Sequence, residues 1–203
     1  TGTVVYNTTT DSVNGHYLFS DIGGFSQKGT YGVKAGFAGT GLLQAADSKT
    51  EALLVGNSAG YAVIVEGKVT NDEGLQSHNK TANRVYQHLL DRGFAPTNIY
   101  YYNYNAGQTG VDALSSKEAV ITTLSGTGIF NLTGKMNNVP APLWVVMVDH
   151  GSPEKFHLNA EAITPDELNT AMTTLEGTLN PAALQEKRII VIGACYSGSF
   201  VPA

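Results

Sequence analysis

Four short apolar runs stand out along the chain, each bounded by polar or glycine-containing stretches. They cover residues 52–56, 98–102, 143–148 and 188–192. Runs of this length, apolar at nearly every position, are typical of strands that are buried on both faces of a sheet. The pattern therefore predicts four buried strands, with residues 52–56 as the first and a long loop from residue 56 to residue 75 after it.

Helical periodicity fills the intervals between these runs. Residues 75–90 place their apolar side chains on one face of a helix. Ser115 and Glu118 have the spacing of a capping box at the start of a second helix. A further capping box at residues 164–167, with proline at the first helical position, opens a helix that runs to about residue 179. Strands that alternate with helices predict an α/β fold with a mainly parallel sheet covered on both faces.

The N-terminal part of the chain has a different composition. Residues 1–46 are rich in Gly, Thr and aromatic residues, contain no proline, and indicate short strands at 4–6, 16–19 and 31–37. Residues 28–41 resemble the closing strands of a bacterial immunoglobulin-like domain. We therefore expect a β-rich segment over residues 1–46, a partial immunoglobulin-like module, and an α/β domain over residues 47–203. The alternative is a β-hairpin that packs against the domain that follows.

Composition and charge exclude several classes of protein. The 203 residues are 42% hydrophobic and 14% charged, with a formal net charge of −5, so wholesale disorder is excluded. The sequence lacks the stripe of basic residues that nucleic-acid-binding proteins normally carry. The longest apolar run, residues 143–148, is too short to span a membrane. The single cysteine, Cys195, can form neither an internal disulfide nor a cysteine-based zinc site.

Reactive residues follow the last two apolar runs. The run at 143–148 leads into His150 and Gly151, and the run at 188–192 leads into Cys195. Because a single helical crossover joins these strands, they should be neighbours whose carboxyl ends meet at one edge of the sheet. A thiol beside an imidazole is what acyl transfer needs: the thiolate attacks a carbonyl and the imidazole handles the protons. The backbone N–H groups of Gly151 and Cys195 are the expected oxyanion donors.

Each of these residues also has an ordinary explanation. A cysteine after an apolar strand is more often buried and inert than catalytic. A histidine at a strand end often has a role in ligand binding or in a turn instead of catalysis. The combined pattern favours catalysis, because both residues end core strands, have a glycine nearby, and lie 45 residues apart.

The two motifs carry a family resemblance. Residues 149–152 (Asp-His-Gly-Ser) and 194–199 (Ala-Cys-Tyr-Ser-Gly-Ser) resemble the catalytic motifs of legumain-type (C13-like) cysteine peptidases. The likeness covers about residues 50–200 and implies a caspase-like three-layer α/β fold. It also implies that His150 is the catalytic histidine, that Cys195 is the nucleophile, and that no cofactor is needed. Asp149 matches the aspartate before the catalytic histidine of legumains; the simpler role is a hydrogen bond within its own turn.

The substrate pocket departs from the legumain pattern. Ser77 stands where legumains carry an arginine, and Tyr196 stands where they carry an acidic residue after the cysteine. Cleavage after asparagine is therefore not implied for this chain. The acidic residues Glu66, Asp72 and Glu73 could form a pocket for a basic side chain, although a solvated charged loop is the favoured interpretation.

The resemblance sets further expectations. The substrate is a protein or peptide. About two more strands should follow residue 203, so we expect a C-terminal fragment or second chain, made by proteolytic processing near that point, to complete the sheet. The alternative is a shorter, self-contained fold. Low charge, abundant Thr, Asn and Gly, and the immunoglobulin-like segment favour a secreted or cell-surface location.

Other functions stay open at this point. The main alternative is a non-catalytic adhesion or scaffold module with a vestigial site, and a flavodoxin-like nucleotide binder is a second. Residues 56–60 (Gly-Asn-Ser-Ala-Gly) match no phosphate-binding fingerprint. Asp149, His150 and His157 lack the spacing of a metal site, so we predict no metal.

Overall fold

The computed structural model describes residues 29–55 and 58–201. The chain divides into two compact units, with the boundary between Val55 and Gly56.

The first unit contains two antiparallel strand pairs. Strand β1 (Gly29–Val33) pairs with β4 (Glu51–Val55), and β2 (Gly36–Phe37) pairs with β3 (Ala46–Asp47). The stretch expected as one strand over residues 31–37 is therefore divided between β1 and β2. The strands expected at 4–6 and 16–19 lie outside the described residues.

The prediction for residues 52–56 was wrong about their sheet. They lie mostly in β4, which pairs antiparallel with β1 in the first unit. The first strand of the parallel sheet is instead β5 (Tyr61–Glu66), all six residues of which are buried. Sequence reasoning placed β5 in a loop because two apolar runs of similar length follow one another there. Apolarity alone does not say which of them pairs with which partner.

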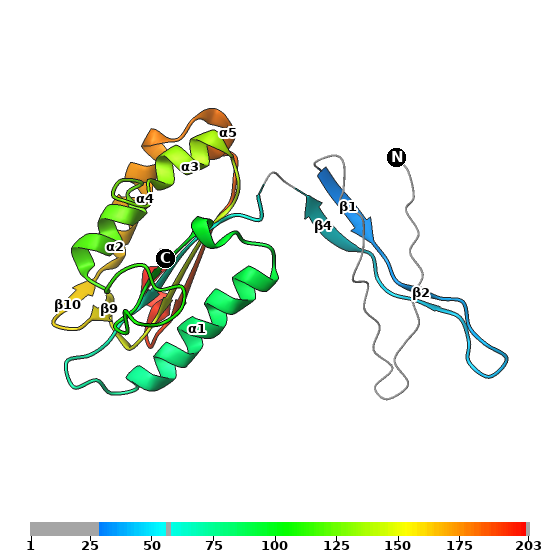
Figure 1. Ribbon diagram of the computed structural model, residues 1–203, viewed down its shortest axis with the longest axis horizontal. Coiled ribbons are helices and arrows are strands. Elements are labelled where there is room, and N and C mark those ends of the chain that lie inside the picture. The colour runs from blue at the N-terminus through cyan, green and yellow to red at the C-terminus, as the bar shows by residue number, and fades with distance from the viewer. Residues whose placement is uncertain (1–28, 56–57, 202–203) are drawn as a thin grey trace. The chain divides into compact units, whose positions relative to one another are not determined.

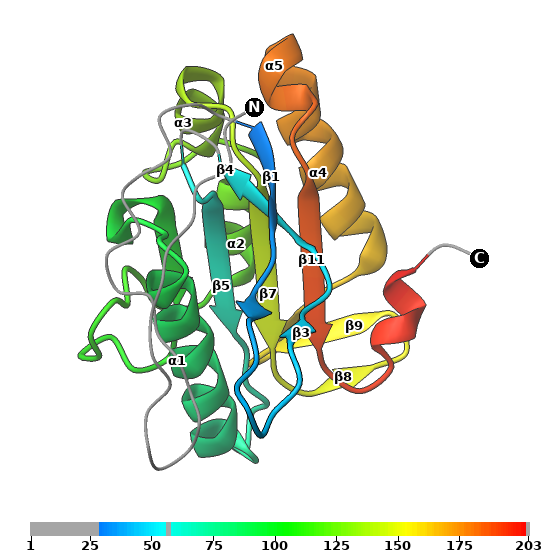
Figure 2. The same cartoon turned by 90° about the vertical axis from the view of Figure 1, so that its right-hand side faces the viewer.

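The second unit is built on a four-stranded sheet that is parallel throughout. The strand order is β11-β7-β5-β6, with β6 at Ile99–Tyr102, β7 at Leu143–Val148 and β11 at Arg188–Gly193. Figure 2 shows β5, β7 and β11 side by side. Strands β7 and β11 are direct neighbours, which confirms the expectation from their single crossover.

Helices cover both faces of this sheet, so the predicted α/β architecture is confirmed. Helix α1 (Leu75–Asp91) lies on one face, and α2 (Lys117–Leu124), α3 (Leu132–Asn138) and α4 (Pro165–Thr178) lie on the other (Figure 1). Short α5 (Pro181–Leu184) follows α4, and a 3₁₀ turn at Pro96–Asn98 precedes β6.

Alternation along β5 divides the core in two. Ala62 and Ile64 pack with the α1 side, whereas Val63 and Val65 pack with the side of α2 and α4. All four side chains are fully buried. Burial of this kind contributes about 1.5–3 kcal/mol for each large aliphatic side chain, so β5 anchors both layers.

Two helix starts test the capping predictions. Helix α4 begins at a complete capping box between Thr164 and Glu167, as predicted. Helix α2 begins one residue later than predicted, because Ser116 rather than Ser115 is its N-cap and accepts from the Ala119 N–H. The Ser115 hydroxyl is buried and instead donates to the carbonyl oxygen of Glu66 at 2.6 Å.

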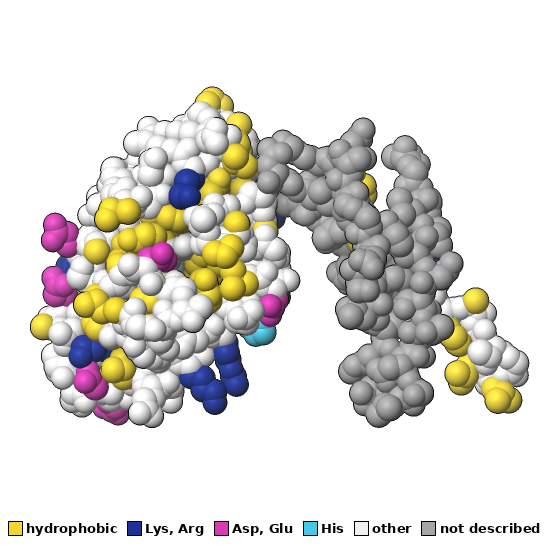
Figure 3. Space-filling view, viewed as in Figure 1, with side chains coloured by type: hydrophobic (Ala, Val, Ile, Leu, Met, Phe, Trp, Pro, Cys, Tyr) yellow, Lys and Arg dark blue, Asp and Glu magenta, His cyan; other side chains and the backbone are white. Residues whose placement is uncertain are grey.

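A small antiparallel sheet follows β7 and was not predicted. It consists of β8 (Gly151–Ser152), β9 (Lys155–Leu158) and β10 (Glu161–Ile163), in the order β10-β9-β8. A 3₁₀ turn at Ser197–Phe200 follows β11. None of the helices among the described residues is long and apolar enough to cross a membrane. On the face drawn in Figure 3, Lys and Arg side chains of the second unit lie singly or in small groups among other residues.

Candidate active site

The candidate site lies at the carboxyl ends of three adjacent strands. Glu66 of β5 and Gly193 of β11 both pair with Val148 of β7, so the three strands end level with one another. Residues that follow these positions therefore emerge at one edge of the sheet, where sites of open parallel sheets are found. Residues 58–60 lie before β5, at the opposite edge of the sheet from these strand ends.

The histidine and cysteine motifs are in contact. The Asp149 N–H donates to the carbonyl oxygen of Gly193 at 3.3 Å. A Cβ added to Gly151 would collide with the carbonyl oxygen of Cys195 and lie 3.1 Å from the Ala194 Cβ. The expected meeting of the two motifs is thus confirmed. Gly151 is needed for this backbone approach, and not only for access to a substrate.

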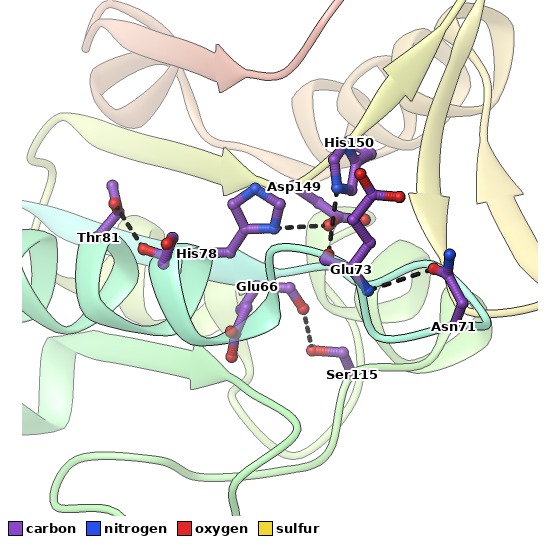
Figure 4. Close-up of polar contacts among 9 residues, drawn as sticks. Glu66, Asn71, Glu73, His78, Thr81, Ser115, Asp149 and His150 are labelled. Carbon is purple, nitrogen blue, oxygen red and sulfur yellow. Dashed lines mark hydrogen bonds and ion pairs between the residues drawn. The ribbon is translucent and has the colours of Figure 1, made fainter.

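A backbone carbonyl fixes the orientation of His150. Its Nε2 lies 3.1 Å from the carbonyl oxygen of Glu73, in the loop before α1 (Figure 4). Because a carbonyl oxygen can only accept, Nε2 carries the proton and Nδ1 is left with its lone pair in the neutral ring. Sequence reasoning considered Glu73 only as an acidic side chain and missed its carbonyl, since a backbone group leaves no residue-type signal.

His78 is a second imidazole in the site. It lies in the first turn of α1, and its Nδ1 is 2.9 Å from Oδ1 of Asp149. Its ring meets that of His150 edge-on, with 4.9 Å between the centroids and 76° between the planes. Nothing in the sequence singled out His78 as a site residue. A histidine placed there for chemistry has no distinguishing local pattern.

Asp149 is buried beneath the two histidines. Its side chain has no exposed surface. Burial raises the pKa of Asp149, and the nearby backbone N–H of His150 and the two imidazoles oppose that shift without cancelling it. The simple role foreseen for Asp149, a bond within its own turn, leaves out its contact with His78.

Glu66 is a second buried carboxyl group at this edge. Burial raises its pKa to about 7, the Tyr104 backbone N–H opposes the shift, and the charge of Asp149 adds to it. The sequence placed Glu66, Asp72 and Glu73 in one loop. The structure separates them: Glu66 is buried at the end of β5, whereas Asp72 is exposed and pairs with Lys68 at 2.6 Å.

The remaining predicted residues lie around this centre. Cys195 is free and exposed, so it is not the buried cysteine of the ordinary explanation. Tyr196 is 65% exposed and adopts a left-handed backbone with φ of 57°. Ser77 is exposed in the first turn of α1, where its carbonyl oxygen accepts from the Thr81 hydroxyl at 2.9 Å.

The prediction of no metal was made for Asp149, His150 and His157. His157 lies in β9, and its backbone N–H donates to the carbonyl oxygen of His150 at 3.3 Å. The group that could hold a metal ion comprises His78, Asp149 and His150, whose ligand atoms all lie within 4.8 Å of one another.

Comparison of the chain with models of known protein families finds no match, and comparison with curated proteins finds none either. The function is therefore argued from the geometry of the site.

Proposed function

We propose that the second unit is a cysteine endopeptidase with a caspase-like fold, similar to the legumain type. The observation that carries the proposal is the contact between the His150 and Cys195 motifs at adjacent strand ends, with the thiol exposed to solvent. Such a contact puts an exposed cysteine and an oriented imidazole at the same edge of the sheet, where nucleophilic catalysis can use both.

The residues have distinct roles in the proposed reaction. Nδ1 of His150 takes the thiol proton of Cys195, and the thiolate attacks the substrate carbonyl. As the peptide C–N bond breaks, His150 returns the proton to the leaving amine and a thioester remains. Water then attacks the thioester, giving up a proton to His150, and the thiol is restored. The carbonyl of Glu73 is a positioning group, since it holds the ring through Nε2.

The local ladder supports the proposed oxyanion site. Because the His157 N–H donates to the carbonyl of His150, residues 150 and 157 form a hydrogen-bonded pair of the antiparallel ladder. The next pair, Gly151 with Phe156, is then of the non-bonded type, and the Gly151 N–H points away from β9. It is thereby available, with the N–H of Cys195, to stabilise an oxyanion.

Specificity and assembly belong to the same proposal. Ser77 and Tyr196 are proposed to border the substrate pocket in place of the legumain arginine and acid. Among the described residues, β11 pairs only with β7, and Ile190 and Val191 are 41% and 44% exposed. An open apolar edge of this kind supports the proposal that a further segment covers it. In this proposal, processing of the same precursor releases that segment. A secreted or cell-surface location stays a prediction.

The test is labelling of Cys195 by an acyloxymethylketone peptide probe, measured by intact mass. We expect the unaltered chain to gain one probe mass, Cys195→Ala to gain none, and His150→Ala to react at least about a hundredfold more slowly. His88→Ala is the matched control, because His88 is exposed on α1 away from the site. Thermal unfolding of each variant shows whether it is folded.

Two results would overturn the proposal. One is a folded, unaltered chain that takes up no probe, which would favour the adhesion or scaffold module with a vestigial site. The other is equal labelling of the unaltered chain and His150→Ala, which would mean an exposed but unassisted thiol.

A further inference from the structure

Three side chains of the candidate site, those of His78, Asp149 and His150, converge on one point. His78 comes from the first turn of α1, and Asp149 and His150 follow β7 (Figure 4). One nitrogen of each imidazole and one carboxylate oxygen lie within 4.8 Å of one another. The cluster is held by a helix and a central strand, so its spacing is set by rigid elements.

The carboxylate in this cluster is poorly satisfied. The Asp149 side chain is fully buried, and neither of its oxygens accepts a well-formed hydrogen bond from the described residues. Nδ1 of His78 lies 2.9 Å from Oδ1 but is likewise without a well-formed hydrogen bond. Buried carboxylates without hydrogen bonds are costly unless a charge or a metal ion compensates them. A protonated His78 can supply part of this compensation, and a cation bound among the three side chains would supply the rest.

We propose that His78, Asp149 and His150 form a binding site for Zn²⁺. Two imidazole nitrogens and one carboxylate oxygen make a donor set that zinc accepts, with the fourth position open to water. Ca²⁺ and Mg²⁺ prefer oxygen ligands throughout and fit this set poorly. Ligands about 2.0–2.2 Å from a tetrahedral zinc lie roughly 3.3–3.5 Å apart, so ligand atoms that all lie within 4.8 Å of one another are close to the spacing that zinc needs.

The site is accessible from solvent. The His78 side chain is 20% exposed, and His150 is half-buried. Only Asp149 is enclosed, and it forms the floor. An ion can thus enter between the imidazoles without opening the core.

Bound zinc would inhibit the enzyme, and this consequence rests on the proposed function. His150 needs both nitrogens: Nε2 donates to Glu73, and Nδ1 exchanges the proton with the thiol. Zinc on either nitrogen removes one of these functions. Zinc binding itself does not rest on the proposed function, because the set of three ligands excludes Cys195.

Binding is measured on the whole chain with Cys195→Ala, which removes the thiol as a competing ligand. Chelator-treated protein is titrated with Zn²⁺ by calorimetry and with Co²⁺ by visible absorption. We expect one equivalent to bind and Co²⁺ to show the intense bands of a four-coordinate site. The further change His78→Ala should weaken Zn²⁺ binding at least tenfold. His78→Gln is the second variant, and His88→Ala is the matched control.

The binding proposal is overturned by either of two results. One is no binding to Cys195→Ala, which would assign zinc to the thiol. The other is equal affinity with and without His78, which would place the metal elsewhere.

Inhibition is measured separately on the chain that keeps Cys195. For each variant, the rate of probe labelling is compared with and without Zn²⁺. We expect zinc to slow labelling at least tenfold in the unaltered chain. In His78→Ala, the labelling rate without zinc divided by the rate with zinc should fall toward one. A chain that binds Co²⁺ as expected but takes up no probe without metal would overturn the peptidase proposal and leave the metal site intact. If zinc slows labelling by the same factor in the unaltered chain and in His78→Ala, the inhibitory role is overturned.

Discussion

His150 and Glu73 lie 77 residues apart in the chain, yet Nε2 of His150 is 3.1 Å from the carbonyl oxygen of Glu73. This contact determines which nitrogen of the ring carries the proton. It also links the loop before α1 to the end of β7, so the position of that loop controls the geometry of the proposed dyad.

Gly74 tests this link. Its backbone is left-handed, with φ of 69°, and an added Cβ would lie 3.2 Å from Nε2 of His150 and 3.0 Å from Cε1 of His78. We expect Gly74→Ala to slow probe labelling of Cys195 by about a hundredfold, because a small misplacement of a catalytic group has effects of that size. The matched control is Gly93→Ala, at another left-handed glycine with open space around it (φ of 86°). It should lower stability and leave labelling unchanged; equal slowing in both variants would contradict the link.

Gly151 tests the contact between the two motifs. Its Cβ would collide with the Cys195 carbonyl, so Gly151→Ala must displace the cysteine loop. We expect labelling to fall at least tenfold. Gly177→Ala, in the last turn of α4 with open space around the Cβ, should instead leave labelling unchanged and raise the free energy of unfolding by at most about 1 kcal/mol. Undiminished labelling of Gly151→Ala would show that the loops need not touch.

Ile64 tests the position of β5 at the centre of the sheet. The side chain is fully buried, so Ile64→Ala should lower the free energy of unfolding by about 2–5 kcal/mol, measured with urea. Ile129 is 94% exposed, and Ile129→Ala should change that free energy by less than about 0.5 kcal/mol. A small effect at Ile64 would return residues 61–66 to the loop that the sequence suggested.

Glu66 gives the fold a pH dependence. Its pKa is raised to about 7 in the folded chain, from an ordinary value of 4.5, mainly by burial. Between these pH values the Glu66 carboxyl group binds more protons in the folded state than in the unfolded state. The contribution of Glu66 to stability therefore falls as pH rises through this window. Glu66→Gln, which cannot ionise, should therefore gain stability relative to the unaltered chain between pH 4 and pH 8.

The gain at pH 8 should reach at most about 3.5 kcal/mol, since the pKa rises from 4.5 to about 7 and one pKa unit corresponds to about 1.4 kcal/mol. It is measured as the difference in unfolding free energy between the two chains at each pH. Glu118→Gln, in the first turn of α2, is the control for loss of a carboxylate outside the site. A difference at Glu66 that is constant with pH would contradict the assignment.

Much of the fold could be predicted from local patterns. The helix of residues 75–90, the capping box at Thr164 and the strand at residues 143–148 follow from periodicity and capping chemistry, which act within a few residues. Strand β5 and the sheet that begins at β8 were missed. Strand β5 is as apolar as the run before it, so composition could not say which of the two joins the parallel sheet, and the short strands from β8 onward depend on partners elsewhere in the chain.

The sequence by itself determined the two reactive motifs, the alternation of strands and helices, and the adjacency of the last two apolar strands. Only the tertiary structure decided that β4 lies in the first unit, that Glu66 is buried, and that His78 joins Asp149 and His150. The physical reason is the separation along the chain over which each kind of interaction acts. Periodicity and caps reflect forces between near neighbours in the chain, whereas strand pairing, burial of a carboxylate and the approach of two imidazoles depend on groups that folding brings together.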